Sequence, residues 1–419
     1  MQRRLKDTDK LSPTPRGDDA SYAFEPIGQC SNSCTGRVFA NRELISSMRT
    51  IAFIAHKGNL GLATRNSEML SRLRSYGKIL EVYHHSKLDL ARGIRLQRLR
   101  RTLWPPFAIG VDLMIGAIVA QLSDFKPRPD FVHAETSPMG YAALTYSEES
   151  GVPYVLDLHG LWSAEHLGRI EAMSATVNRR RASAIQYMER IEREAARRAD
   201  RLLVVSEAMK AHVVMNWGVS ASRVQVIPNG GFKSSGRATF SATPKLVYGG
   251  LLAYWEKWRD FVEMSQYWDV PGSKLLMLGG GPDIRMLRRQ LKALRPRNLS
   301  YLGMWSRDEA LELFLQSQIG VAPSSDDLAR RVAWPIKVMD YMSSGLPVIA
   351  PMVGDWGRMV RERNAGVVTT RSDPREFCEA ARSLCSREDW NRASKNALDT
   401  AQSDYLWNKV LEPLDNLYL

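Results

Sequence analysis

The chain has 419 residues, of which 44% are hydrophobic and 25% are charged, as in an ordinary globular protein. This length exceeds one typical core and suits two α/β domains. The 58 Lys and Arg residues outnumber the 45 Asp and Glu residues, so the net charge is +13. A basic chain favours an anionic partner such as a phosphorylated substrate or a membrane surface. No nucleic-acid-binding signature accompanies the charge, so nucleic acid is not an expected partner.

Residues 1–47 are polar and lack apolar periodicity, so we expect a disordered or peripheral N-terminal extension. Met48 directly precedes the first convincing strand, and translation starting there is a hypothesis that the mass of the native protein would test. The four cysteines form neither a zinc spacing nor a disulfide framework, which favours a reducing cytosol. The longest apolar run, 107–122, is short and contains Asp112, so it predicts a buried helix rather than a membrane span.

Residues 49–61 predict a strand followed by a glycine-containing turn. The strand covers 49–55, and Gly58, Asn59 and Gly61 lie in the turn that follows. A helix over 64–76 comes next, with Leu70 and Leu73 facing inward. Strand, glycine turn and helix form a Rossmann-like opening, although the glycine spacing is not that of a dinucleotide fingerprint.

A strongly basic segment follows the second predicted strand, 79–84. Residues 92–101 read RGIRLQRLRR, and Trp104 and Phe107 come soon after. Basic residues beside aromatic ones suit an anionic membrane interface. A solvated helix face followed by a buried one is the alternative, and it is slightly favoured.

Asp157 and His159 leave the end of a predicted strand that begins at Val152, and Gly160 then allows a sharp turn. An earlier strand covers 131–134. Ligands of open α/β sheets bind beyond the carboxyl ends of strands, which is where Asp157 and His159 lie. A lone histidine is more often structural, although a strand end is where ligand-facing groups lie.

A second Rossmann-like unit begins after a Gly, Ser and Thr-rich linker at 231–243. A helix over 178–200, a strand, and a helix over 207–217 capped by Ser206 precede the linker. In the second unit, strand 245–248 leads to Gly249 and Gly250, and strand 274–278 leads to Gly280 and Gly281. Glycines at these places allow the backbone to approach a diphosphate closely.

Residues 334–350, WPIKVMDYMSSGLPVIA, predict a helix that Gly345 ends and a buried strand over 347–350. The helix N-terminus and Lys337 would attract phosphate. Asp340, one turn later, could accept hydrogen bonds from a ribose. Without further support, an ordinary helix–strand unit explains the same residues equally well.

This stretch resembles the P-x-K-x-x-E-Y-M-x-x-G-x-P-V signature of the GT-B-fold glycosyltransferases of family 4, with Asp340 in place of the usual Glu. A second block, from Ala199 to Gly230, resembles the family pattern A-D-x-(apolar)-V-S … V-x-V-I-P-N-G. The resemblance covers residues 48 to about 400. It implies an α/β fold in which a Rossmann-like acceptor domain, 48–230, and a Rossmann-like nucleotide-sugar domain, 244–400, face a cleft. Residues 401–419, with Tyr405 and Trp407, would pack back on the first domain.

The resemblance also implies roles for particular residues. His159 and Asp157 would be catalytic, and Gly58, Asn59 and Gly61 would form an acceptor-side cleft loop. The donor-binding residues would be Gly249, Gly250, Lys257, Gly280, Gly281, Lys337 and Asp340. No metal and no cofactor beyond the donor are expected, and the one clean DxD motif, at 7–9, lies in the N-terminal extension.

Two positions depart from the family pattern. Leu251 stands where the family has an Arg that holds the donor phosphates, and Val332 stands where it has the first of two Glu residues. Nearby charged residues that could substitute for that Glu are Asp326, Asp327, Arg330 and Arg331. The phosphate clamp is therefore altered or supplied from elsewhere.

The expected activity is retaining transfer of a sugar from a nucleotide diphosphate sugar to an acceptor hydroxyl. Family habit and the basic segment at 92–107 suggest that the acceptor is a growing cell-surface polysaccharide, which a lipid can carry. They also suggest a cytoplasmic enzyme that can lie on the inner face of the membrane. A sugar-nucleotide epimerase with the same fold and a binding-only relative are the alternatives. The donor base, the sugar and the acceptor cannot be inferred from the residues.

Overall fold

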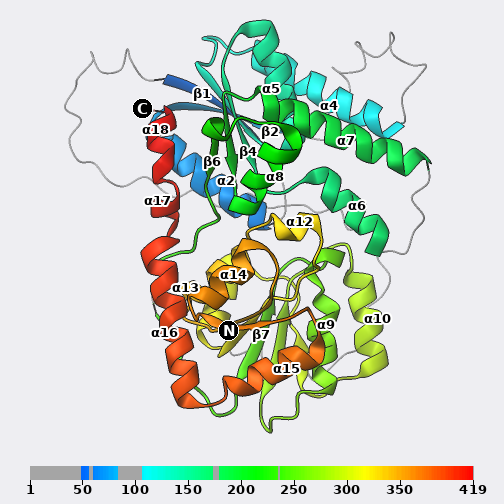
Figure 1. The fold of residues 1–419 in the computed structure, drawn as a ribbon, viewed down its shortest axis with the longest axis vertical. Helices are drawn as coiled ribbons and strands as arrows, with labels where there is room; N and C mark the ends of the chain where they lie inside the picture. Colours follow the sequence, from blue (N-terminus) through cyan, green and yellow to red (C-terminus); the bar gives the residue numbers. More distant parts are fainter. Residues whose placement is uncertain (1–48, 56–59, 84–105, 173–178, 235, 419) are drawn as a thin grey trace, which may run out of the picture. The chain divides into compact units, whose positions relative to one another are not determined.

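The computed structural model describes residues 49–55, 60–83, 106–172, 179–234 and 236–418. The basic segment at 92–101, together with Trp104, Gly58 and Asn59, lies outside the described residues. Two six-stranded sheets, both parallel throughout, organise the described part of the chain (Figure 1). This confirms the α/β fold with two Rossmann-like units.

The N-terminal sheet has the strand order β2-β1-β3-β4-β5-β6. Its strands are β1 (Arg49–Ala55), β2 (Gly77–Tyr83), β3 (Phe131–Glu135), β4 (Tyr154–Leu158), β5 (Arg201–Val204) and β6 (Val224–Val226). The helices of this half are α2 (Leu60–Leu73), α4 (Pro106–Ser123), α5 (Ser137–Ser150), α6 (Trp162–Ala172), α7 (Arg179–Arg198) and α8 (Glu207–Trp217), with a 3-10 turn η4 (Ala221–Arg223).

The C-terminal sheet has the order β12-β11-β10-β7-β8-β9, the arrangement of a doubly wound nucleotide-binding sheet. Its strands are β7 (Lys245–Gly249), β8 (Lys274–Leu278), β9 (Leu299–Tyr301), β10 (Ile319–Val321), β11 (Val348–Pro351) and β12 (Gly366–Thr369).

Helices and 3-10 turns connect the strands of the C-terminal half. They are η5 (Tyr254–Glu256), α9 (Trp258–Glu263), η6 (Met264–Gln266), α10 (Ile284–Leu294), α11 (Arg307–Leu315), α12 (Leu328–Arg331), α13 (Ile336–Ser343), α14 (Gly354–Glu362), α15 (Pro374–Ser383) and α16 (Arg387–Asp404). The chain then ends in α17 (Trp407–Val410), η7 (Glu412–Leu414) and α18 (Asp415–Tyr418).

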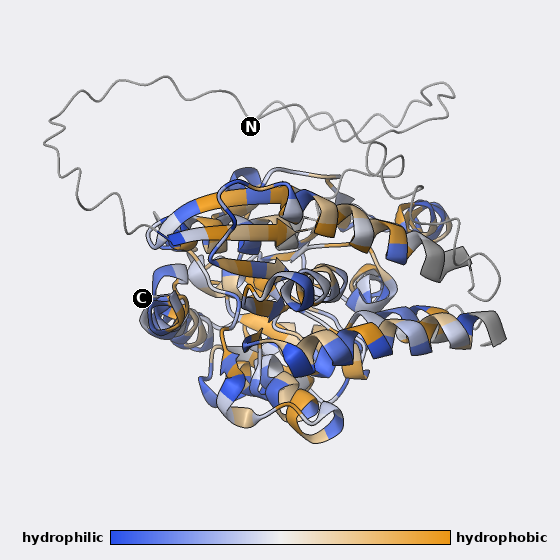
Figure 2. Ribbon diagram, turned by 90° about the horizontal axis from the view of Figure 1, so that it is seen from above, coloured by the Kyte–Doolittle hydropathy of each residue, from blue (hydrophilic) through white to orange (hydrophobic). Residues whose placement is uncertain are grey.

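The strands are short apolar runs because both faces of a parallel sheet are covered by helices. In β1, Ile51, Phe53 and Ile54 are fully buried, and β11 is buried along its whole length. Figure 2 shows the hydrophobic residues concentrated in the strands and the hydrophilic ones on the outer faces of the helices.

Two local signals read from the sequence, the Ser206 cap and the helix end at Gly345, have their expected structures. The Ser206 hydroxyl accepts a hydrogen bond from the backbone N–H of Met209 at the start of α8. Ser306 and Glu309 form a capping box at the start of α11. Gly345 adopts a φ of 74° after α13, a conformation that other residues rarely take. At the other end of the chain, α2 begins at Leu60, so Gly61 lies in its first turn rather than in a loop.

Helix α4 coincides with the apolar run at 107–122 and packs into the core through Val111, Ile115, Ile118 and Leu122. Asp112 accepts a hydrogen bond from the Tyr187 hydroxyl of α7, at 2.5 Å, so the one charge of the run has a partner. Within the described ranges, none of the helices combines the length and apolar character that crossing a membrane requires.

The C-terminal segment packs against the N-terminal sheet, as expected for Trp407. Trp407, Leu411, Leu414 and Tyr418 share a buried cluster with Ile51 and other residues of that sheet. Tyr405 packs beside Trp334 in a tilted ring pair, with the ring centroids 5.3 Å apart. The segment that follows α16 therefore returns from the C-terminal half to the N-terminal half.

Candidate active site

Sheet order locates the ligand-binding edge of the N-terminal half. In open α/β sheets, ligands bind at the carboxyl ends of strands where the strand order reverses, here between β1 and β3. Glu135 ends β3 at this edge. Its neighbour in register on β4 is Asp157, so the two carboxylates lie side by side on one face of the sheet. Both side chains are fully buried.

His159 is the counter-charge of this carboxylate pair. Its Nε2 lies 2.5 Å from Oε2 of Glu135 and 3.3 Å from Oδ2 of Asp157. Neither ring nitrogen makes a directed hydrogen bond within the described residues, so attraction between charges holds the imidazole. A buried polar group without a directed partner marks a candidate functional position.

Arg65 of α2 forms the other half of the cluster. Its Nε and Nη2 donate to the two carboxylate oxygens of Asp157 at 3.0 and 2.9 Å. Its Nη1 donates to the backbone carbonyl of Ile227 and to Oδ1 of Asn229, both at 3.1 Å. Arg65 is only 1% exposed, so a buried bidentate pair ties α2 to β4 and to the end of the N-terminal half.

Charges of opposite sign set the protonation states in this cluster. Burial by itself would lower the pKa of His159, but Glu135 and Asp157 raise it to about 9. Burial would raise the pKa of Asp157, yet Arg65 and His159 hold it well below its usual value. Burial would raise the pKa of Glu135 too, but His159 and His133 together lower it. The group is therefore two carboxylates balanced by a guanidinium and an imidazolium.

A second histidine connects the cluster to the C-terminus. The Nδ1 of His133 lies 2.7 Å from the Tyr418 hydroxyl, and its Nε2 lies 3.2 Å from Oε1 of Glu135. His133, Glu135 and Asp157 bring possible metal-ligand atoms within 4.8 Å of one another. However, Arg65, His159 and Tyr418 already engage these atoms. We therefore interpret the group as an ion-pair cluster rather than a cation site.

In the C-terminal half, the strand order reverses between β7 and β10. Gly249 ends β7 at this edge, and two glycine loops meet beside it. A Cβ on Gly279 would lie 1.8 Å from the carbonyl oxygen of Gly250, so only glycine fits there. The backbone N–H of Leu252 donates to the carbonyl of Gly280 at 2.8 Å, and Gly281, with a φ of 148°, lies against the backbone of Leu252.

Lys337 of α13 reaches this pair of loops. A Cβ on Gly250 would meet its Nζ at 2.9 Å, so the ammonium lies against the Gly250 backbone. Nζ also lies over the Tyr248 ring, 4.8 Å from the centroid, and forms an ion pair with Glu256. Burial lowers the pKa of Lys337, and Glu256 opposes that shift. The expected grouping of Gly249, Gly250, Gly280, Gly281 and Lys337 is thus present in space.

Arg330 and Glu165 join the two halves of the site. Arg330 of α12 lies 3.7 Å from Glu256 and 3.8 Å from Glu165 of α6, and its side chain is 11% exposed. Glu165 interacts electrostatically with His159, and burial raises its pKa. A set of ion pairs therefore runs from Glu165, through Arg330 and Glu256, to Lys337, and electrostatic attraction extends it from Glu165 to His159.

Asp340 has a partner that the sequence did not suggest. Nη2 of Arg307 lies 2.5 Å from its Oδ1, and the Arg307 guanidinium stacks 3.5 Å from the Phe232 ring centroid. Burial raises the pKa of Asp340, and Arg307 opposes this shift. A ribose at Asp340 would share the carboxylate with Arg307.

The other candidate positions from the sequence either lie on the surface or have other roles. Lys257 is exposed at the start of α9, and its neighbour Glu256, rather than Lys257 itself, contacts Lys337. Val332 is buried, and its carbonyl accepts a hydrogen bond from the Ser206 hydroxyl at 2.6 Å. Asp327 caps α12, and Asp326 pairs with Arg331 on the surface. Of the four charged residues near Val332, Arg330 is the one that joins the Lys337 cluster.

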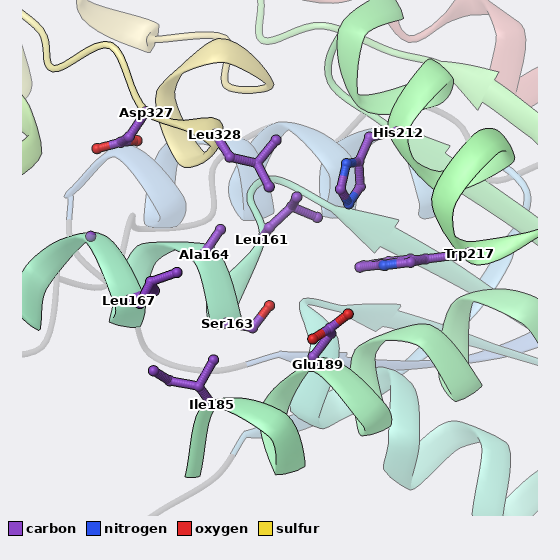
Figure 3. A pocket seen from close by; sticks show the side chains of 11 residues that line it. Leu161, Ser163, Ala164, Leu167, Ile185, Glu189, His212, Trp217, Asp327 and Leu328 are labelled. Carbon is purple, nitrogen blue, oxygen red and sulfur yellow. The ribbon is translucent and has the colours of Figure 1, made fainter. Parts of the chain in front are cut away.

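A pocket of about 230 Å³ opens beside the loop that follows His159. Side chains from α6, α7, α8 and α12 converge on it, so both halves contribute (Figure 3). Its wall is mostly apolar, with Leu161, Leu167 and Trp217, and His212 and Glu189 add polar groups. The pKa of His212 is lowered by burial, against the attraction of Glu189.

Sequence reasoning missed Arg65, Glu135, Glu165, Glu256 and Arg307 as site residues. Glu135 had a readable signal, because it ends a strand, where the ligand-facing groups of open α/β sheets lie. The other four are charges on helices and loops, and their partners lie far away in sequence. Arg65 and Asp157, for example, are separated by 92 positions.

Two family models match the chain. One, described as a glycosyl transferase 4-like domain, matches residues 73–230, and the other, described as glycosyl transferases group 1, matches residues 244–387. A known relative, the 2-deoxystreptamine N-acetyl-D-glucosaminyltransferase of Streptomyces fradiae, is 26% identical over 277 residues, which are 61% of this chain and 62% of that enzyme. The chain therefore spans less than two thirds of the relative's length.

Solved structures share the fold at low sequence identity. Sucrose-phosphate synthase of Thermosynechococcus elongatus superposes with a TM-score of 0.68 at 15% identity, covering 88% of this chain and 98% of that one. Anabaena HepE in complex with UDP-glucose gives 0.66 at 15% identity, with 88% and 99% covered. WaaG, a glycosyltransferase involved in lipopolysaccharide biosynthesis, gives 0.63 at 13% identity, with 87% and 99% covered.

Proposed function

This chain belongs to the group 1 glycosyltransferases of GT-B fold, and on that premise we propose that it transfers a sugar from a nucleotide diphosphate sugar to an acceptor hydroxyl. The observation that carries the proposal is the charged path from His159 to Lys337. It joins the ligand-binding edges of two nucleotide-type sheets, which is where a donor held by one half would meet a group of the other.

The C-terminal half would hold the donor. Departure of a nucleoside diphosphate leaves negative charge that preorganised cations and backbone N–H groups stabilise best. Lys337 lies against the Gly250 backbone, and Arg330 lies near the same carboxylate, Glu256. We assign these two cations to the diphosphate, and Arg330 replaces the Arg that is missing at Leu251. The donor would displace Glu256 as their counter-ion.

The N-terminal half would hold the sugar being transferred. His159 is an imidazolium at neutral pH, because its pKa is raised to about 9. It can therefore donate a hydrogen bond or stabilise negative charge, but it cannot accept a proton. Asp157 is a poor general base as well, because Arg65 and His159 hold its pKa far below the operating pH. This arrangement suits sugar transfer better than the proton abstraction that an epimerase requires.

We further propose retention of configuration and independence of metal ions. HepE was solved with UDP-glucose, so UDP sugars are the first donors to test. The proposed acceptor is a saccharide hydroxyl, and the pocket beside His159 is the proposed place for it. A lipid-linked polysaccharide acceptor, at the inner face of the cytoplasmic membrane, remains the proposal that the basic segment at 92–101 suggested.

The test begins with a thermal-shift screen of UDP, GDP, ADP and dTDP sugars, followed by an assay of nucleotide release and product analysis with the donor that binds. Lys337→Ala should lower kcat by about 100-fold, as loss of one transition-state charge contact does. Exposed Lys257→Ala is the matched control and should retain most of the rate.

Other outcomes are equally informative. An epimerised free nucleotide sugar would assign the chain to the epimerases instead. If the wild type bound the donor but turned it over no faster than Lys337→Ala does, the chain would be a binding protein. The anomeric configuration of the product tests retention, and an unchanged rate in EDTA tests metal independence.

A further inference from the structure

Helix α10 presents a basic stripe on the surface of the C-terminal half. Arg285, Arg288, Arg289 and Lys292 are exposed and follow an i, i+3, i+4, i+7 spacing, so they share one face of the helix. The opposite face packs on the core through Ile284, Leu287, Leu291 and Leu294. Arg295 and Arg297, both exposed, continue the positive charge beyond the end of the helix.

The stripe lacks the acidic partners that several exposed arginines have elsewhere. Arg331, Arg358 and Arg382 each pair with an aspartate at 2.7–2.8 Å. No described acidic side chain forms an ion pair with any of the six cations of α10 and its continuation, and α10 itself contains no Asp or Glu. Like charges one turn apart destabilise a helix. An anionic surface laid on the stripe would remove that repulsion.

An exposed apolar side chain accompanies the stripe. Met286 is 39% exposed at its edge, and Nη2 of Arg259 lies 3.5 Å from its Sδ. A flexible apolar side chain flanked by cations suits a lipid interface, where it can enter the acyl region while the cations stay among the phosphates.

We propose that α10 docks on an anionic lipid surface, with Arg285, Arg288, Arg289 and Lys292 facing the headgroup phosphates. The four cations lie along about 10 Å of a straight helix, which matches a flat surface. Single-stranded nucleic acid is bound with aromatic stacking platforms. Among the described residues, the one exposed large aromatic side chain is Tyr267, and Arg375 already covers its ring. The observations therefore favour lipid over nucleic acid.

This surface differs from the segment 92–107 of the N-terminal half, for which the sequence offered membrane binding as the less favoured of two interpretations. It also does not depend on the proposed sugar transfer. Helix α10 follows directly after the glycine loop 279–281, so docking through it would place the C-terminal half, with its Lys337 cluster, next to the membrane. Figure 1 shows α10 on the outer side of the C-terminal sheet.

The test measures co-sedimentation of the full chain with vesicles of phosphatidylcholine, with or without about one third of phosphatidylglycerol. The wild type should bind only the anionic vesicles. Binding should weaken as salt is raised, because the Debye length falls from about 8 Å to about 3 Å between 0.15 and 1 M. Each cation near an anionic surface contributes roughly fivefold, so the triple variant Arg288→Gln, Arg289→Gln, Lys292→Gln should bind about 100-fold less tightly.

The matched control removes three other exposed cations, Arg358→Gln, Arg361→Gln and Arg371→Gln, which already have acidic partners. It changes the net charge equally and should bind as the wild type does. Three results would overturn the proposal: equal loss in both triple variants, undiminished binding by the α10 variant, or binding of a DNA duplex but not of anionic vesicles. Equal melting temperatures of the two variants would show that folding is not the cause.

Discussion

The charge on His159 follows from residues on three different elements. Glu135 and Asp157 come from neighbouring strands, and Arg65 comes from α2. With one guanidinium against two carboxylates, a buried imidazole at this place is protonated, because the cluster would otherwise keep an uncompensated buried charge. The positive charge of His159, which is proposed to act on the sugar donor, therefore also stabilises the fold.

This charge predicts a pH dependence of stability. The pKa of His159 is about 9 in the folded protein, above the value of about 6.5 for an unfolded chain. Between these values only the folded state keeps the proton, so the contribution of His159 is complete below pH 6.5 and is lost as the pH rises through 9. The stability difference between wild type and His159→Gln, measured by urea unfolding, should shrink by a few kcal/mol from pH 6 to pH 10.

His212 provides an internal control of opposite sign. Burial lowers its pKa, so its unfolded state binds the proton more readily and stability rises with pH through about 6.5. His212→Gln should therefore gain stability relative to wild type at low pH. If the two histidine variants had the same pH slope, the ion-pair account of His159 would be wrong.

Residue types at strand ends could be read from the sequence, but their partners could not. Asp157 and His159 lie at the end of β4, and Gly249 and Gly250 lie beside Lys337, as strand-end and motif reasoning expected. Asp340 was expected to be available to a ribose, and the structure pairs it with Arg307, 33 positions away. A charge on a helix does not indicate which distant charge it will meet, because tertiary packing decides that.

At the scale of elements, strand order explains why the site lies where it does. The expected strands come close to the observed ones, because apolar runs bounded by glycine and proline are strong local signals. The pairing of β3 with β4, which brings Glu135 beside Asp157, joins segments more than twenty residues apart. Local patterns do not contain that information.

The C-terminal helix α18 is an element whose role became visible only in the structure. The Tyr418 hydroxyl bonds to Nδ1 of His133, whose Nε2 faces Glu135. A hydroxyl that donates to Nδ1 fixes the tautomer with a proton on Nε2, which then points at the carboxylate. Docking of α18 therefore orients Glu135, the closest partner of His159.

We expect Tyr418→Phe to lower kcat by roughly fivefold to tenfold, the effect of losing about one net hydrogen bond. The high-pH limb of the kcat profile should move to lower pH, because a misdirected Glu135 supports the imidazolium less. Tyr76→Phe is the matched control: its hydroxyl bonds Asp415 of the same helix without touching His133. If both variants lost kcat equally and the high-pH limb of the kcat profile did not move, the Tyr418 hydroxyl would only help α18 to dock and would not orient Glu135.

At the scale of the whole molecule, a few directed bonds connect the two sheets. The Tyr254 hydroxyl donates to the carbonyl of Glu165 at 2.8 Å, and the Ser206 hydroxyl donates to that of Val332 at 2.6 Å. Asn229 is central among them, because its Oδ1 accepts from Arg65 while its Nδ2 donates to the carbonyl of Trp334 at 2.6 Å. Two residues after Trp334, α13 begins, and it carries Lys337.

The two hydrogen bonds of Asn229 therefore predict that stability and donor binding are coupled between the N-terminal and C-terminal halves. Asn229→Ala should cost about 1–3 kcal/mol, because it leaves buried partners unsatisfied. It should also raise the KM for the donor, since α13 loses its tie to Arg65, and it should speed proteolysis in the linker at 231–243. Asn298→Ala is the control: its amide likewise makes two hydrogen bonds, donating to the carbonyls of Ser265 and Trp268, but within the C-terminal half alone. It should lose comparable stability with the donor KM and linker cleavage unchanged. If both variants weakened donor binding equally, the cause would be a general loss of stability. The hydrogen bond from Asn229 to Trp334 would then not be what positions the two halves of the site relative to each other.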